Sequence, residues 1–264
     1  MHDDAALRQS TSGLGVSTAL AVGILIGASF LDGALQGVAW GVAIVLDMGG
    51  PYLFGAAGWK LVPEHFAERH GLIIIIALRE SIVAIGAGVS GDITAGVVAA
   101  AVLGIVLAAT MWWAYFDVVA LVAGRRLAGI TDIKERNETA RDSYSYLHLP
   151  MVAGIVLVAL GMKKTIGQVG DPLEVEAAFA LIGGFSLYLL AHVGFRLRNV
   201  RTLNRRRLAL AIGLFALLPL AVEIAALATL AILTAAACVL IAYETIRFTD
   251  SRDRVRHEMA GSLG

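Results

Sequence analysis

Long apolar segments separated by short polar ones make up this chain, and that pattern constrains its fold more than any other feature. The hydrocarbon core of a bilayer takes about 20 residues of helix. We expect eight spans of suitable length: Leu14–Phe30, Val38–Ala56, Leu72–Val89, Ile93–Val122, Leu147–Gly161, Val175–Phe195, Leu208–Ala225 and Ala226–Tyr243. The boundary between the last two is the least defined, because no polar turn separates them.

The composition agrees with a membrane protein. Of the 264 residues, 58% are hydrophobic and only 16% are charged, whereas soluble domains carry about 25% charged residues. Lipid offers no partners to backbone N–H and C=O groups, so each span must be a helix. The predicted fold is therefore all-α, a polytopic bundle of about eight transmembrane helices forming a single domain over residues 1–264.

The positive charges predict the orientation of these spans. If both termini are cytoplasmic, the loops on that side hold nearly all of the 21 lysines and arginines. Only Lys163 and Lys164 fall on the opposite side, and Arg79 lies within a span. Because positive residues accumulate in cytoplasmic loops, we expect a cytoplasmic loop over 124–146 and a cytoplasmic tail over 244–264.

The basic loop Arg196–Arg207 follows the sixth span. Its arginines could hold anionic lipid headgroups, although fixing the topology is enough to explain them, and we favour that simpler interpretation. We expect the lipid bilayer as a partner and no nucleic acid. The sequence leaves the oligomeric state open.

Arg79, Glu80 and Ser81 form a polar group inside the third span. Glu80 lies about 13 Å along a helix from Gly71, near the midplane of a core about 30 Å thick. An ionised residue at that depth costs around 3 kcal/mol on insertion scales. Glu80 is therefore either a candidate proton or cation site or a structural group at a helix interface. Arg79 points about 100° away around the helix and needs another carboxylate.

Two further carboxylates could complete an ion or proton relay with Glu80, Arg79 and Ser81. Asp47 lies in the second span just before the Gly49-Gly50-Pro51 segment, which should kink or interrupt the helix. Broken helices near the midplane build ion sites in many transporters. Asp117 lies toward the cytoplasmic end of the fourth span.

A cluster of His and charged residues precedes the third span. On a helix, His65, Glu68 and Arg69 share one face. His and Glu at this spacing can bind a metal, with His148 as a further ligand, or they can form a salt-bridged cap at the membrane surface. We favour the cap. Metal binding is left open, and no cofactor is expected.

Three stretches together resemble the bacterial low temperature requirement A (LtrA) family: HFAERHGLIIIIALRESIVAIG, MWWAYFD and YLHLPMVAGIVLVALG. The resemblance implies a multi-pass protein of the bacterial inner membrane whose biochemical activity is undefined. The family name refers to growth in the cold. The positions that match the family motifs are His65, Glu68, Arg69, Glu80, Ser81, Asp117 and His148.

The chain departs from the family pattern in two ways. Family members usually begin with an ELFFDL-like block and further spans, and nothing here matches that block, so the chain resembles the C-terminal two-thirds of a member. The third span usually reads LGES, whereas this chain has Arg79 in place of the glycine.

Three classes of function follow from these residues. The first is movement of a proton, ion or small solute through an intramembrane carboxylate site. The second is a non-transporting scaffold or a protein of stress or cold adaptation. The third is a metal-dependent membrane enzyme using His65, Glu68 and His148. It ranks last because the sequence has no nucleophile elbow, P-loop or dinucleotide fingerprint, so we favour a non-enzyme.

Overall fold

The computed structural model describes residues 2–54, 59–89, 91–247 and 249. Within these ranges the chain is helical and forms no β-strand, and seven helical segments are long and apolar enough to cross a membrane. The predicted all-α, polytopic fold is therefore confirmed. The chain divides into two compact units: Met1–Val62 with Ile130–Asp142, and Pro63–Gly129 with Ser143–Gly264.

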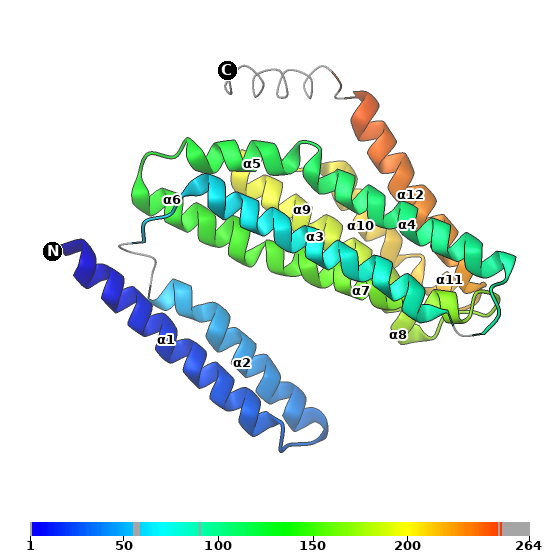
Figure 1. Ribbon diagram of the computed structural model, residues 1–264, viewed down its shortest axis with the longest axis horizontal. Coiled ribbons are helices and arrows are strands. Elements are labelled where there is room, and N and C mark those ends of the chain that lie inside the picture. Colours follow the sequence, from blue (N-terminus) through cyan, green and yellow to red (C-terminus); the bar gives the residue numbers. More distant parts are fainter. Residues whose placement is uncertain (1, 55–58, 90, 248, 250–264) are drawn as a thin grey trace. The chain divides into compact units, whose positions relative to one another are not determined.

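The first unit is built on a hairpin of two long helices, α1 (His2–Ala28) and α2 (Gly33–Leu53), which lie side by side (Figure 1). Gly50 contacts the Ser17 side chain so closely that a Cβ at position 50 would clash with it. Such small-residue contacts are typical of helices that associate in lipid.

Of the predicted kink or interruption of the second helix, the interruption does not occur. α2 continues through Pro51 and ends only at Leu53, and the Phe54 N–H still donates to the Gly50 carbonyl. Because Pro51 lies in the last turn, it removes a single hydrogen bond near the helix end. Asp47 therefore lies on a continuous helix.

A short helix, α6 (Ile133–Thr139), and the start of a π-helix, η1 (Ala140–Tyr146), also belong to the first unit. The Arg141 guanidinium carbon lies 4.0 Å from the centre of the Tyr52 ring, and the Tyr52 hydroxyl donates to Asp142 at 3.3 Å. Much of the segment 124–146, expected as a polar loop, is thus helical.

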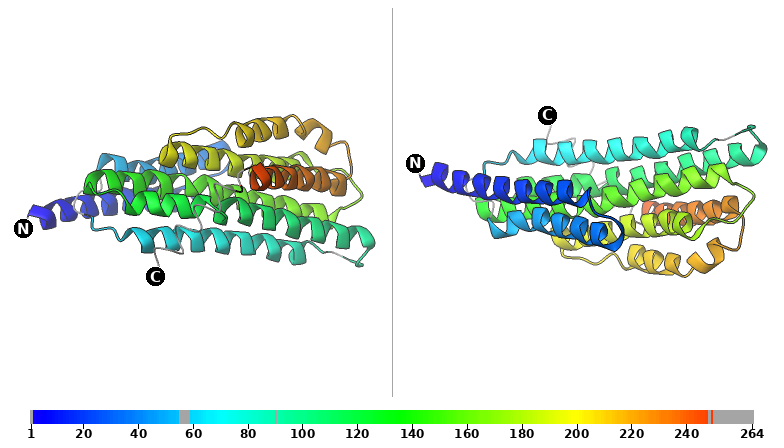
Figure 2. Two further views of the ribbon diagram at one scale, coloured as in Figure 1. Left: turned by 90° about the horizontal axis from the view of Figure 1, so that it is seen from above. Right: turned by 90° about the horizontal axis from the view of Figure 1, so that it is seen from below.

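The second unit contains the other helices. They are α3 (Pro63–Gly88), α4 (Ala95–Phe116), α5 (Val119–Ala128), α7 (His148–Gly167), α8 (Val175–Ala178), the π-helix η2 (Phe179–Gly183), α9 (Gly184–Val200), α10 (Arg205–Phe215), α11 (Leu218–Ala221) and α12 (Ala226–Arg247). α7 packs against both α3 and α9, and α4 packs against α3 and α12 (Figure 2).

Glycines allow α7 to approach η2 and α9 closely. A Cβ at Gly154 would lie 2.6 Å from the Gly184 carbonyl oxygen, and a Cβ at Gly161 would lie 2.6 Å from the Leu181 Cα. Only glycine permits backbone contact of this kind. The close packing fixes α9, which carries several residues of the cavity described below.

The segment predicted as the seventh span, Leu208–Ala225, is not one helix. It forms most of α10 and all of α11, and neither is long enough to cross a bilayer by itself. Pro219 fits the first turn of α11, where its missing N–H is not needed, but it cannot continue the preceding helix. The predicted boundary at Ala226 is confirmed, because α12 begins there.

Within the described residues, seven helical segments are thus long and apolar enough to cross a membrane, where the sequence predicts about eight. The cytoplasmic placement of both termini stays a prediction. α12 extends to Arg247, so the predicted tail 244–264 begins inside a helix, and nearly all of its remainder lies outside the described residues.

Candidate functional site

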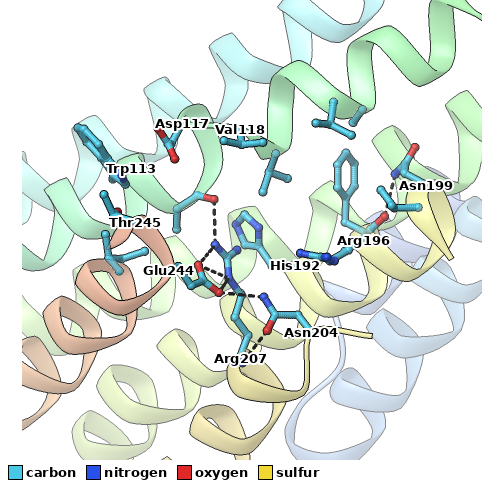
Figure 3. Close-up of a pocket in the computed structure, with 17 residues that line it drawn as sticks. Trp113, Asp117, Val118, His192, Arg196, Asn199, Asn204, Arg207, Glu244 and Thr245 are labelled. Atoms are coloured by element: carbon cyan, nitrogen blue, oxygen red, sulfur yellow. Dashed lines mark hydrogen bonds and ion pairs between the residues drawn. The ribbon is translucent and has the colours of Figure 1, made fainter. Parts of the chain in front are cut away.

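The second unit contains a cavity of about 410 Å³ at the end where α4, α9 and α12 finish and α10 begins. A volume of this size lies within the range of small-molecule sites. The cavity is lined by both apolar and polar side chains (Figure 3). The polar ones are Asp117, His192, Arg196, Asn199, Asn204, Arg207, Glu244 and Thr245.

A buried ion pair forms part of the lining. Arg207 Nη2 donates to Glu244 Oε2 at 2.7 Å, and Arg207 Nε donates to the two carboxylate oxygens at 3.1 and 3.3 Å. Only 7% of the Arg207 side chain and 16% of the Glu244 side chain are exposed. A bidentate arginine–carboxylate pair of this kind fixes the geometry of both side chains.

The surroundings of the pair satisfy its remaining groups. Arg207 Nη2 also donates to the Ala114 carbonyl at 3.4 Å, and Asn204 Nδ2 donates to Glu244 Oε1 at 2.9 Å. The pair therefore links the start of α10 to the ends of α4 and α12. It closes this end of the unit without leaving a bare charge.

The local sequence explains why Arg207 reaches this position. α9 ends at Val200, and its C-cap, Arg201, has a left-handed φ of 56°. α10 begins after Asn204, which accepts a hydrogen bond from the Arg207 N–H at 3.2 Å. This is a standard helix N-cap. A positive side chain in the first turn opposes the helix dipole, and the Glu244 carboxylate compensates for it.

His192 lies among the charged side chains of the lining (Figure 3). It is 2% exposed, and neither ring nitrogen has a hydrogen-bond partner in the part of the chain that the structure describes. Its ring contacts Tyr115 and Tyr188, with centroids 6.0 and 4.5 Å away. Buried polar groups are normally hydrogen-bonded, so an unpaired imidazole beside a cavity is a candidate ligand contact.

Opposite charges flank His192. Asp117 is the C-cap of α4, and Arg196 extends from α9, where its Nε donates to Thr202 Oγ1 at 2.9 Å. The two side chains lie on different sides of His192 in Figure 3, and Trp113 lies beside Asp117. A carboxylate near an indole suits a positive group, and a guanidinium suits a negative one.

Of the predicted relay residues, only Asp117 lines this cavity. Glu80 and Arg79 are exposed on α3, whereas Ser81 is buried, with no hydrogen-bond partner for its hydroxyl among the described residues. Asp47 belongs to the first unit, where it accepts a hydrogen bond from Thr18 Oγ1 at 2.8 Å.

The polar cluster at the start of α3 is at the surface. His65 Nδ1 lies 3.5 Å from Glu68 Oε2, both side chains are largely exposed, and Arg69 is exposed as well. α3 begins at Pro63, so these residues are helical and share one face as predicted. No three His, Cys, Asp or Glu side chains within the described ranges converge as metal ligands.

His148 is buried in an aromatic cluster instead. Its Nδ1 lies 3.0 Å from the Ser143 carbonyl oxygen, and its Nε2 lies 2.8 Å from the Tyr115 hydroxyl. A carbonyl can only accept, so Nδ1 carries the hydrogen and Nε2 of the neutral ring accepts from Tyr115. The Tyr144 ring stacks on His148 at 5.2 Å. Both nitrogens of His148 are thus engaged by protein groups.

Sequence reasoning missed the ion pair of the cavity. The sequence pattern places Arg207 in a basic loop and Glu244 in the C-terminal tail. One available signal was that each residue directly adjoins an apolar helix, where an unpaired charge is unfavourable. Their pairing across 37 positions depends on the fold and could not be read from spacing.

Comparison with known proteins identifies a family model and a curated relative. The model described as "Bacterial low temperature requirement A protein (LtrA)" matches residues 1–242. A protein of Rhizobium meliloti (strain 1021), described as "Uncharacterized protein RA0937", is 31% identical over 167 residues, which is 59% of this chain and 40% of the relative. The match thus spans less than half the length of that relative. No solved structure gives a significant match.

Proposed function

The chain belongs to the bacterial low temperature requirement A (LtrA) family and is an integral membrane protein, and on this basis we propose that it is a transporter that binds a small solute in the cavity of its second unit. The observation that carries the proposal is the cavity itself, about 410 Å³ in volume and lined by charges of both signs. A scaffold that only packs against other proteins has no need for such a lined space.

The lining favours a solute that carries both a positive and a negative group. Arg207 and Glu244 neutralise each other at 2.7 Å, so they shape the wall and contribute little net charge. Asp117 and Arg196 add one charge of each sign on different sides of His192. A small zwitterion, such as an amino acid, matches this arrangement in charge and is small enough to enter the cavity.

The three carboxylates of the predicted relay have separate roles in this proposal. Asp117 contacts the positive group of the solute, because it is the predicted relay residue that lines the cavity. Glu80 is exposed on α3 and takes no part in solute binding. Asp47, bonded to Thr18, supports the helix hairpin of the first unit.

The proposed location is the bacterial inner membrane, with the cavity at the cytoplasmic end of the bundle. The distribution of lysine and arginine supports this orientation. Arg201 and Arg205 are exposed between α9 and α10, where anionic lipid headgroups of the inner leaflet would lie. Lipid contact and solute binding thus involve different arginines of one basic segment.

Binding can be tested on the full chain in detergent with three small probes that differ in the charged groups they carry. Alanine is the zwitterion, propionate lacks the ammonium group and ethylamine lacks the carboxylate. We expect alanine to raise the melting temperature more than either of the other two, because it alone can engage both Asp117 and Arg196. Equal shifts by all three probes, or none, would contradict a zwitterion site.

Transport can be tested by the uptake of labelled alanine into proteoliposomes. His192→Phe keeps a ring but removes both nitrogens, and we expect it to reduce uptake at least tenfold while the protein stays folded. Glu223→Gln, which alters an exposed carboxylate away from the cavity, is the control and should leave uptake unchanged. Alanine binding without uptake would favour a non-transporting sensor, and equal uptake by the two variants would remove His192 from the site.

A further inference from the structure

One face of α3 is not covered by the helices of its own unit. Buried residues such as Ile74, Leu78 and Ser81 face α7 and α4, while the opposite face is exposed, with Ile76 at 64% and Val83 at 47%. Exposed apolar side chains are expected where a helix faces lipid. Contact with lipid does not explain why the exposed face of α3 also carries two charged side chains.

Arg79 and Glu80 are both exposed on this face, and neither has an ion pair or hydrogen bond among the residues that the structure describes. Gly71 and Gly88 lie about 12–14 Å to either side along the helix, so both charges lie near mid-membrane. They cannot neutralise each other, because adjacent residues point about 100° apart around a helix. Groups of this kind almost always face protein or water in place of lipid.

We infer that the exposed face of α3 is the contact between two copies of this chain, in which Arg79 of each copy pairs with Glu80 of the other. Identical copies insert into the membrane in the same orientation, so residues of equal depth meet across a two-fold axis along the membrane normal. A two-fold contact pairs residue i with j and j with i. Arg79 and Glu80 have opposite charges at nearly the same depth. This part of the α3 face is therefore complementary to the same part of a second copy.

The neighbouring side chains fit the same arrangement. Ile76 lies one turn before Glu80, and Val83 lies one turn after Arg79, so apolar residues flank the two charges along the exposed face. They would exclude water from the two ion pairs, which strengthens the attraction between the charges. Gly86 has no atom near its missing Cβ and leaves room for the second helix.

The test uses the full chain carrying two different affinity tags, mixed in detergent and reconstituted into lipid. We expect the two tagged forms to purify together. R79E and E80R, each reconstituted alone, should reduce the co-purified fraction at least tenfold, because each places four like charges at one depth. E64R makes the same kind of change at an exposed position before the apolar stretch of α3 and should have no effect.

Charge reversal makes the test specific to the pairing. Mixing the R79E chain with the E80R chain should restore co-purification, and the double variant R79E/E80R should restore it within one chain type. If α1 and α2 cover this face instead, mixing restores nothing, and the inference is overturned. A wild-type chain that is monomeric in lipid, or single variants that still associate fully, would overturn it as well.

Discussion

The Arg207–Glu244 pair offers a direct test of how this membrane fold accommodates charge. Arg207→Met keeps most of the side-chain volume but removes the positive group. Glu244, only 16% exposed, then keeps a single hydrogen bond, from Asn204 at 2.9 Å. Removing one partner of a buried pair typically costs about 3–5 kcal/mol, because the other charge stays buried without compensation.

Removing both charges should cost far less than removing one. In Arg207→Met/Glu244→Leu, no buried charge is left, and apolar replacement of a buried pair is often neutral or stabilising. We expect the double variant to lie within about 1 kcal/mol of the parent chain. The coupling energy between the two positions is then about 3 kcal/mol or more, which is large for residues in contact.

Thermal unfolding of the full chain in one detergent measures these differences. For a chain of this size, 1 kcal/mol corresponds to about 2–4 °C in Tm, so a loss of about 3–5 kcal/mol in Arg207→Met should lower Tm by about 6–20 °C. The double variant should recover most of that loss. Glu244→Leu alone is the second single variant that the coupling energy requires. If the Tm loss of the double variant equals the sum of the losses of Arg207→Met and Glu244→Leu, the side chains act independently and the ion pair does not hold this end of the unit.

Two further predictions concern packing and polar satisfaction in the second unit. Gly161→Ala should destabilise by about 1–3 kcal/mol, because the new Cβ would lie 2.6 Å from the Leu181 Cα. Gly213→Ala, where nothing lies within 4 Å of the added Cβ, should be neutral or slightly stabilising in the same Tm measurement. Tyr115→Phe removes the hydroxyl that donates to His148 at 2.8 Å and should cost about 1–3 kcal/mol, because it leaves a buried acceptor unpaired. Tyr144→Phe should cost nothing, because its buried hydroxyl has no partner in the described residues; equal losses for the two tyrosines would refute this hydrogen-bond assignment.

The sequence predicts where the helices lie more accurately than where a helix is interrupted. Apolar runs locate membrane helices because lipid leaves the backbone no alternative, and the start of α12 at Ala226 follows the predicted boundary. Hydropathy carries no information about where a helix is interrupted. It predicts one span over Leu208–Ala225, which forms two short helices. The Gly49-Gly50-Pro51 segment predicts a kink or an interruption, and α2 is not interrupted there.

The candidate site was less accessible to sequence reasoning than the fold. Depth along a span can be estimated from residue number, and so Asp117 and Glu80 could be proposed as intramembrane charges. The direction in which each side chain points cannot be estimated in that way. Asp117 lines the cavity and Glu80 is exposed on α3, and this difference depends on which helices pack against α4 and α3.

Each charge within the spans raises the same physical question of what compensates for it, and the chain shows different answers. Asp47 accepts a hydrogen bond from Thr18 inside the helix hairpin, and Glu244 receives a bidentate arginine at the wall of the cavity. Arg79 and Glu80 have no such partner among the described residues. Since the cost of a bare charge near the midplane, around 3 kcal/mol, applies to each of them, compensation must come from outside the second unit. In a two-fold contact, Arg79 and Glu80 of a second copy supply this compensation. The same requirement, that each charge within the membrane has a partner, explains the Arg207–Glu244 pair in the wall of the cavity.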